Sequence, residues 1–342
     1  MVSVLHLFLQ ILTLLTPSSP WSLNKQTSQS NDIVFEFTGL VTLYKNGSVW
    51  RADVGYIPAS LLDPLTGVSS KDVVVEPKTG LSARLFLPNI TDPDTKLPLL
   101  IYFHGGAFII ESAFSPTYHN YVSSIVQQAN VVGMSVDYSL APEYPLPIAY
   151  EESWSAIQWA VSRSNGEEWF RKHVDLERIF LVGDSAGGNI AHNMAIQAGV
   201  SGLNGLKIEG IVLLDPLFNG IEPVGAEVVN LSHIRVDTLW RAIYPSTTGS
   251  DDPQINPEKD PQFSRLGCNR VFVCAAEKDD LIDRDRLYYD KLGKSGWIGV
   301  VEFMISPGEG HVFQLTRPTS EHANELMKRV VSFVNNSSRL AV

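Results

Sequence analysis

The chain has 342 residues, of which 44% are hydrophobic and 18% are charged, and its formal net charge is −11. This length and apolar content suit one large α/β domain, and the negative charge argues against nucleic acids and anionic membrane surfaces as partners. The sequence contains no metal-ligand spacing, phosphate-binding loop or internal repeat, so we expect neither a metal nor another cofactor.

The N-terminal region predicts a targeting segment. Residues 2–15 are almost wholly apolar, and small residues follow at Ser18, Ser19 and Ser22. This pattern resembles a secretory signal peptide and is too short to span a bilayer. We therefore expect a signal peptide at 1–22, a polar linker at 23–32, a single domain at 33–338 and no stable membrane insertion.

Two further features bear on location. Five N-x-S/T sequons are compatible with secretion and begin at Asn46, Asn89, Asn230, Asn335 and Asn336. No Lys or Arg lies near Met1, which keeps a cytoplasmic location open as the alternative to a secreted one. Cys268 and Cys274 flank a strand-like run and would lie too far apart to form a disulfide when extended.

The first element with chemical content is a strand followed by a glycine loop. Residues 99–103 read as a buried strand, which runs directly into His104-Gly105-Gly106. A loop of this kind can present backbone N–H groups to an oxyanion. An ordinary strand-ending turn is the alternative.

A serine lies at the turn of a second strand. The apolar run 178–182 leads into Gly183-Asp184-Ser185-Ala186-Gly187 and then into a helical stretch. The flanking glycines allow a sharp backbone turn and the close approach of other segments. A serine hydroxyl becomes a useful nucleophile when it is exposed on such a turn beside a base and oxyanion donors.

An acid and a histidine follow two later strands. The run 270–276 ends just before Asp279, and the run 300–305 ends in a loop that carries His311. The carboxyl ends of parallel strands lie at one edge of a sheet, so both side chains are expected on the same side as Ser185. The order Ser, Asp, His predicts a catalytic triad of Ser185, Asp279 and His311.

The alternatives for these two roles fit less well. The rival acids are Glu277, Asp280 and Asp283, which are also explained as a charged helix start. The remaining histidines precede the acid or lie in helical or apolar stretches: His6, His104, His119, His173, His192, His233 and His322.

The sequence also predicts helices at 118–128, 149–162, 284–294 and 320–334.

Together these motifs resemble a plant carboxylesterase of the hormone-sensitive-lipase-like group of α/β hydrolases. The resemblance covers roughly residues 31–335, through matching runs at 63–73, 102–108, 137–143, 183–189, 276–279, 294–297 and 310–313. It implies an α/β-hydrolase fold with a mostly parallel central sheet flanked by helices. It also implies a cap, formed largely by the N-terminal segment 35–64 with help from residues 215–245. The family pattern favours Asp279 over Asp280 as the acid.

The resemblance further implies an oxyanion hole built from the N–H groups of Gly105, Gly106 and Ala186. Ala107 and Phe108 are expected to be additional donors or pocket residues. Ala107 stands where the family often has a third glycine. It keeps the hole intact if its φ is negative, and its methyl group narrows the acyl pocket, which predicts a preference for short acyl chains.

Another departure is Asp215-Pro216-Leu217, where the family usually has a His-Pro-Tyr type of sequence, and a changed pocket wall is expected there. The implied function is hydrolysis of a small-molecule carboxylic ester through an acyl-enzyme. The alternatives are a lyase, dehydratase or cyclase of plant specialised metabolism and, further away, a ligand-binding receptor. The motifs encode neither the natural ester nor the oligomeric state.

Overall fold

The computed structural model describes residues 32–162 and 166–336. The predicted signal peptide (1–22) lies outside the described residues, as do the predicted linker apart from Asp32 and the last two residues of the predicted domain. Within the described ranges, no helix is both long and apolar enough to cross a membrane.

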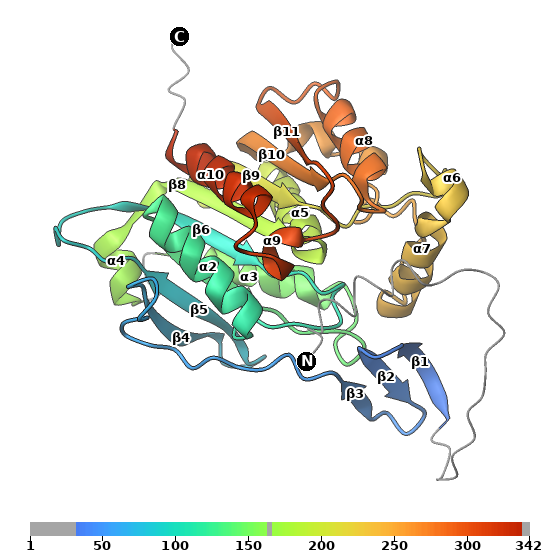
Figure 1. Cartoon of the computed structure of the whole chain (residues 1–342), viewed down its shortest axis with the longest axis horizontal. Coiled ribbons are helices and arrows are strands. Elements are labelled where there is room, and N and C mark those ends of the chain that lie inside the picture. The colour runs from blue at the N-terminus through green and yellow to red at the C-terminus, as the bar shows by residue number, and fades with distance from the viewer. Residues whose placement is uncertain (1–31, 163–165, 337–342) are drawn as a thin grey trace.

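The centre of the molecule is an eight-stranded, mostly parallel sheet (Figure 1). Its spatial order is β11-β10-β9-β8-β6-β7-β5-β4, and only the pairings of β5 with β4 and with β7 are antiparallel. The strands are β4 (Ser69–Glu76), β5 (Leu81–Leu87), β6 (Leu97–Phe103), β7 (Val132–Asp137), β8 (Val174–Asp184), β9 (Ile208–Leu214), β10 (Cys268–Ala276) and β11 (Val300–Ser306).

Helices cover both faces of this sheet (Figure 1). All seven residues of β6 are buried, as expected for a strand covered on both faces. The helices of the main domain are α2 (Pro116–Ala129), α3 (Ile148–Val161), α4 (Glu168–His173), α5 (Ala186–Ser201), α8 (Ile282–Leu292), α9 (Phe313–Thr316) and α10 (Glu321–Asn335), with 3-10 turns η1 (Pro257–Lys259) and η2 (Phe263–Arg265). The four strands expected from the sequence are present, as are the four helices expected by range and the helical stretch that follows Ser185.

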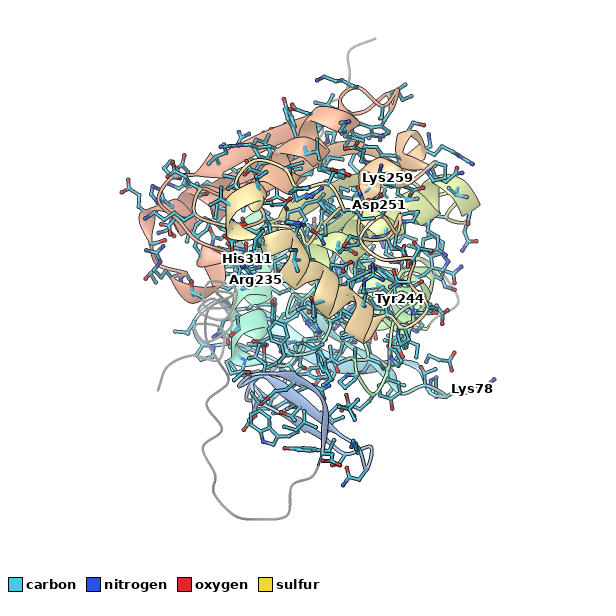
Figure 2. All side chains as sticks on the ribbon, turned by 90° about the vertical axis from the view of Figure 1, so that its right-hand side faces the viewer. Lys78, Arg235, Tyr244, Asp251, Lys259 and His311 are labelled. Carbon is cyan, nitrogen blue, oxygen red and sulfur yellow. The ribbon has the colours of Figure 1, made fainter. Side chains whose placement is uncertain are left out.

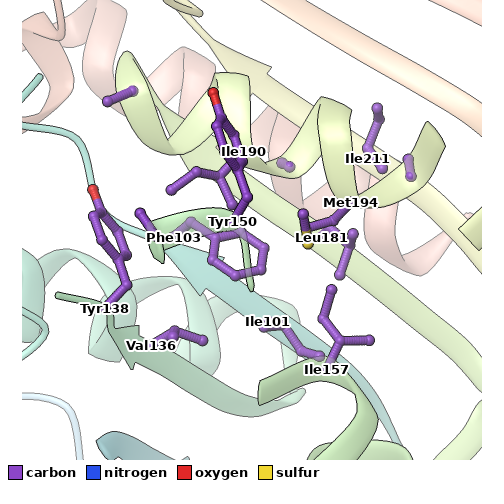
Figure 3. Packing of buried hydrophobic residues seen from close by; sticks show 14 of the residues in the cluster. Ile101, Phe103, Val136, Tyr138, Tyr150, Ile157, Leu181, Ile190, Met194 and Ile211 are labelled. Atoms are coloured by element: carbon purple, nitrogen blue, oxygen red, sulfur yellow. The ribbon is translucent and has the colours of Figure 1, made fainter. Parts of the chain in front are cut away.

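Alternate residues of the central strands feed two hydrophobic cores. Ile101 and Phe103 face α3 and α5 and pack near Ile157 and Ile190 (Figure 3). Leu100 and Tyr102 face the opposite core, which includes residues of α2 and α10. This two-residue period on a strand buried on both sides fixes its register. It thereby fixes the place at the carboxyl edge where β6 ends and the loop that begins at His104 starts.

The start of α2 shows how local chemistry sets an element. Ser115 is the N-cap, and its side chain accepts from the Tyr118 N–H, while Pro116 occupies the first turn. The helix ends at Asn130, whose φ of 52° is left-handed. These caps fix the position of α2, which carries Tyr118 toward the loop after β6.

A cap made of two chain segments lies at one end of the domain (Figure 1). The N-terminal part is a small sheet of β1 (Ile33–Phe37), β2 (Val41–Tyr44) and β3 (Val49–Arg51). The second part carries α6 (Glu227–Asn230) and α7 (Ser232–Ile243). Leu40 and Val41 are fully buried and join the same core as Trp240 and Ile243.

Candidate active site

Ser185 lies between β8 and α5 in a strained backbone conformation, with φ 52° and ψ −118°. Such a conformation costs about 1–3 kcal/mol and is held by its surroundings. The glycines are required by close contacts. A Cβ on Gly183 would lie 2.2 Å from Gly187 O, and one on Gly187 would lie 2.0 Å from Phe103 O. The turn therefore presses against the end of β6, beside the glycine loop.

The structure brings Ser185, His311 and Asp279 into one hydrogen-bonded row. His311 Nε2 lies 3.0 Å from Ser185 Oγ, and His311 Nδ1 lies 2.6 Å from Asp279 Oδ2. With its proton on Nδ1, the imidazole donates to the carboxylate and accepts from the serine hydroxyl. All three side chains are buried, so water competes little with these bonds.

The rival acids have other partners. Asp280 pairs with Arg235 at 2.5 Å and accepts from Asn230, which ties the acid loop to the cap. Arg235 belongs to α7 and is labelled in Figure 2. Asp283 accepts from the Ala226 N–H. Glu277 accepts from the Gly308 N–H. Among the sequence candidates, Asp279 is thus the one that faces His311.

The surroundings of His311 favour its charged form. Burial lowers the pKa of His311, but the charge and hydrogen bond of Asp279, with the charges of Asp215 and Asp184, together raise it to about 9. The sequence could not rank burial against the Asp279 charge. In the structure the carboxylates dominate, because several of them surround one imidazole.

One of the predicted oxyanion donors has other partners. The Gly105 N–H donates to Tyr118 Oη at 2.8 Å and to Asp184 Oδ1 at 3.2 Å. The N–H of Gly105, which the sequence predicts as an oxyanion donor, is therefore already paired with two protein groups in this structure. The tight contact explains why a glycine is needed, because a Cβ here would lie 2.3 Å from Asp184 Oδ2.

The next residues of the loop retain unused N–H groups. Among the described residues, no acceptor pairs with the N–H of Gly106 or Ala107. Ala186 is the first residue of α5, where a backbone N–H has no partner inside the helix. Gly106, Ala107 and Ala186 are thus the donors that the structure leaves available.

Ala107 has a positive φ where a negative one was expected, yet its N–H still has no acceptor among the described residues. Its φ is +54°, and that of Phe108 is +63°, so both adopt the left-handed conformation that favours glycine. Ala107 is 2% exposed, and Phe108 is fully buried against Tyr138, Tyr150 and Trp240. The loop is therefore held in a strained shape by packing around Phe108.

Asp184, to which the sequence analysis gives no role, organises this side of the site. Its carboxylate accepts from the hydroxyls of Tyr102 at 2.7 Å and Tyr118 at 2.8 Å, as well as from Gly105. Burial raises the pKa of Asp184 to about 6, against the opposing effect of these hydrogen bonds and of His311. The signal available in the sequence was its place beside Ser185 at the end of β8.

Asp215 lies at the end of β9, beside the histidine and its acid. In the described part of the chain, Asp215, Asp279 and His311 form the one cluster whose ligand-type atoms lie within 4.8 Å of one another, close enough for a metal ion. Both Asp215 oxygens accept backbone N–H bonds, and His311 Nδ1 faces Asp279. The ligand-type atoms of this cluster are therefore already paired with protein groups, and the three residues are part of a hydrogen-bonded network.

Comparison with known proteins agrees with this geometry. Residues 100–315 match the model of a family described by the α/β-hydrolase fold. A solved hyperthermophilic esterase from the archaeon Pyrobaculum calidifontis is 26% identical and superposes with a TM-score of 0.64, covering 78% of this chain and 85% of its own. The chain therefore belongs to the α/β-hydrolase family.

Similar sequences narrow this assignment. "Probable carboxylesterase 2" of Arabidopsis thaliana is 44% identical over 311 residues, which cover 90% of this chain and 98% of that protein. A 2-hydroxyisoflavanone dehydratase of Glycyrrhiza echinata is 41% identical over 322 residues, with 90% and 98% covered. Within the family, the chain is a member of the plant carboxylesterases of the hormone-sensitive-lipase-like group.

Proposed function

We propose that the chain is a serine carboxylesterase that hydrolyses a small-molecule ester with Ser185, His311 and Asp279 as its triad. The observation that carries this proposal is the hydrogen-bonded row of 3.0 Å and 2.6 Å at the carboxyl edge of the sheet. Asp279 orients the imidazole and stabilises the imidazolium that forms during the reaction.

The reaction proceeds through an acyl-enzyme. Ser185 Oγ attacks the ester carbonyl while its proton passes to His311 Nε2, and the carbonyl oxygen becomes an oxyanion. The N–H groups of Gly106, Ala107 and Ala186 stabilise this charge, and each such donor is worth about 3 kcal/mol in comparable sites. His311 then protonates the departing alkoxide, and water, activated by the same imidazole, releases the carboxylic acid and restores Ser185.

A dehydratase is the second candidate, because one of the similar proteins carries that name. Elimination would use His311 and the oxyanion donors without forming an acyl bond to Ser185. The intact row from Ser185 to Asp279 favours hydrolysis, since it prepares a nucleophile that elimination does not need.

The test is a panel of p-nitrophenyl esters of increasing acyl length, assayed with the wild type and with Ser185→Ala. The wild type should hydrolyse the shorter esters, and the variant should lose about 10⁶-fold in turnover, as other triad knockouts do. Circular dichroism checks that the variant is folded. Near-wild-type hydrolysis by a folded Ser185→Ala protein would exclude Ser185 as the nucleophile, and a wild type that leaves all esters intact would point to elimination.

We further propose that the chain enters the secretory pathway. The support is the apolar segment at residues 2–15 and the sequons, whose asparagines are exposed at Asn46, Asn89, Asn335 and Asn336 and half-buried at Asn230. A fusion of residues 1–32 to a fluorescent protein should be secreted from plant cells, whereas the same fusion without residues 1–22 should stay in the cytoplasm. Equal cytoplasmic retention of both fusions would overturn this proposal.

A further inference from the structure

We propose that Asp215 is a second acid of this site, a positioning residue that joins the loop of Asp279 to the loop of His311 and holds the imidazole in place. This inference rests on the proposed esterase function. Asp215 directly follows β9, the strand between the one that leads to Ser185 and the one that leads to Asp279.

The carboxylate of Asp215 makes one bond to each loop. Its Oδ1 accepts from the Ala276 N–H at 2.7 Å, and Ala276 is the last residue of β10 before the acid loop. Its Oδ2 accepts from the Val312 N–H at 2.8 Å, and Val312 directly follows His311. One side chain thus fixes the backbone beside both partners of the acid–histidine pair.

The bond to Val312 supports an unfavourable backbone. Val312 has a φ of 46°, which is rare for a β-branched residue, and it is 2% exposed. Without the Asp215 acceptor, the Val312 N–H would be buried without a partner, and the strained turn would lose this restraint. Rotation of this turn would move His311 away from Ser185.

The charge of Asp215 also acts on His311. Burial raises the pKa of Asp215 to about 7 and the charge of Asp279 adds to this effect, while the charge of His311 and the two backbone hydrogen bonds oppose it. In its ionised form, Asp215 is one of the groups that raise the pKa of His311. It therefore favours the imidazolium that forms when Ser185 gives up its proton.

Three other groups face Asp215 from the elements packed around it. They are Tyr121 on α2, Cys274 on β10 and Asp285 on α8. Burial raises the pKa of all three, so the Tyr121 and Cys274 side chains stay uncharged near neutral pH. Asp285 is fully buried, and neither of its oxygens has a hydrogen-bond partner within the described residues. Asp285 therefore provides a matched control: a buried carboxyl group close by, without bonds to either loop.

The experiment compares wild type, Asp215→Asn and Asp285→Asn across the full pH profile of p-nitrophenyl butyrate hydrolysis. Active sites are counted with a fluorophosphonate that labels the reactive serine. Asparagine keeps the size of Asp215 but offers one acceptor instead of two and removes the charge. For Asp215→Asn we expect kcat at the alkaline plateau to fall by about tenfold or more, with KM nearly unchanged.

The acid limb of the profile separates positioning from a purely structural role. Without the Asp215 charge the pKa of His311 falls, so the acid limb of kcat/KM should move to lower pH in Asp215→Asn. Asp285→Asn should keep both the plateau and the limb of the wild type. A lowered plateau with an unmoved limb in Asp215→Asn would overturn the proposal, as would a profile equal to that of the wild type.

Two checks keep the result unambiguous. If Asp215→Asn fails to fold, Asp215→Ser, which is smaller and also neutral, is held to the same two criteria. The profile is read only relative to a wild-type activity that Ser185→Ala abolishes. Failure of the proposed esterase function would therefore show in the wild type and in Ser185→Ala. Failure of the Asp215 inference would show only in the Asp215 variant.

Discussion

The two halves of the site are built in different ways. On the acid–histidine side, side chains do the positioning: Asp279 and Asp215 hold His311 and its loop, and Asp280 ties the acid loop to Arg235 of the cap. On the oxyanion side, three consecutive residues, Gly106 to Phe108, adopt positive φ, and packing and backbone contacts hold them.

Arg51 reinforces the oxyanion side from the cap. Its Nε donates to Ile109 O at 2.7 Å, and its guanidinium also donates to Ala141 O and pairs with Glu143. Because the two halves are held in different ways, substitutions in them should have different effects. Neutralising a carboxylate should disturb protonation on one side, whereas changes in backbone freedom or in buried hydroxyls should disturb the other through stability and pocket shape.

Among the changes that test this difference between the two halves, the largest effect is expected from Asp279→Asn. An amide in place of the carboxylate favours the wrong imidazole tautomer, so turnover should fall by about 10⁴-fold while the fold is kept. Asp280→Asn is the matched control, because its carboxylate faces Arg235 and Asn230 instead of His311. Measured kcat should change little in the control. Exchanged phenotypes of the two variants would move the acid by one residue.

A shift in the pH profile is the next effect in size. Because the pKa of His311 is raised to about 9 and the neutral imidazole is the active form, kcat/KM should fall as pH drops, at values well above the ordinary 6.5. In Asp279→Asn the main raising influence is gone, so the residual activity should persist to lower pH. A wild-type acid limb below 6.5 would show that burial outweighs the carboxylates.

A smaller effect should follow from Tyr118→Phe on the oxyanion side. The change removes a hydroxyl that donates to Asp184 and accepts from the Gly105 N–H. Leaving such buried partners unpaired costs about 1–3 kcal/mol, which a denaturant titration can measure. Tyr121→Phe on the same helix is the control, because the Tyr121 hydroxyl has no partner among the described residues. Equal losses in both variants would argue against the Asp184 network.

The smallest effect is expected from Ala107→Gly. Glycine removes the left-handed strain of an alanine, which is about 1–2 kcal/mol per residue, so the melting temperature should rise. The freed space should also improve turnover of longer acyl chains relative to acetate. Ala129→Gly, a buried helical position of α2, should instead lower the melting temperature. An unchanged chain-length profile would show that Ala107 does not line the acyl pocket.

Much of the site could be predicted because its residues directly follow the carboxyl ends of parallel strands, which lie together at one edge of the sheet. Ser185, Asp279 and His311 each follow a strand that the sequence marks with an apolar run, and parallel strands bring these ends together. The same rule applies to Asp215 after β9. The sequence predicts only a changed pocket wall at Asp215, because the two bonds of its side chain are to backbone groups 61 and 97 positions away.

The oxyanion loop was less predictable for a physical reason. A glycine motif shows that the backbone bends, but not which N–H points into the site. The direction of the Gly105 N–H is set by Tyr118, 13 positions on, and by Asp184, 79 positions on. The φ of Ala107 is set by the packing around Phe108, which involves Trp240 of the cap. Such long-range contacts leave no trace in the local sequence.

The central claim is that Ser185, activated by the His311–Asp279 pair, forms an acyl-enzyme. The direct test is rapid mixing with p-nitrophenyl acetate, acid quenching and mass spectrometry of the digested protein. A burst of p-nitrophenol equal to the number of active sites, with an acetyl group on the Ser185 peptide, is the predicted result. Turnover without a burst, or an acetyl group on another residue, would contradict the account.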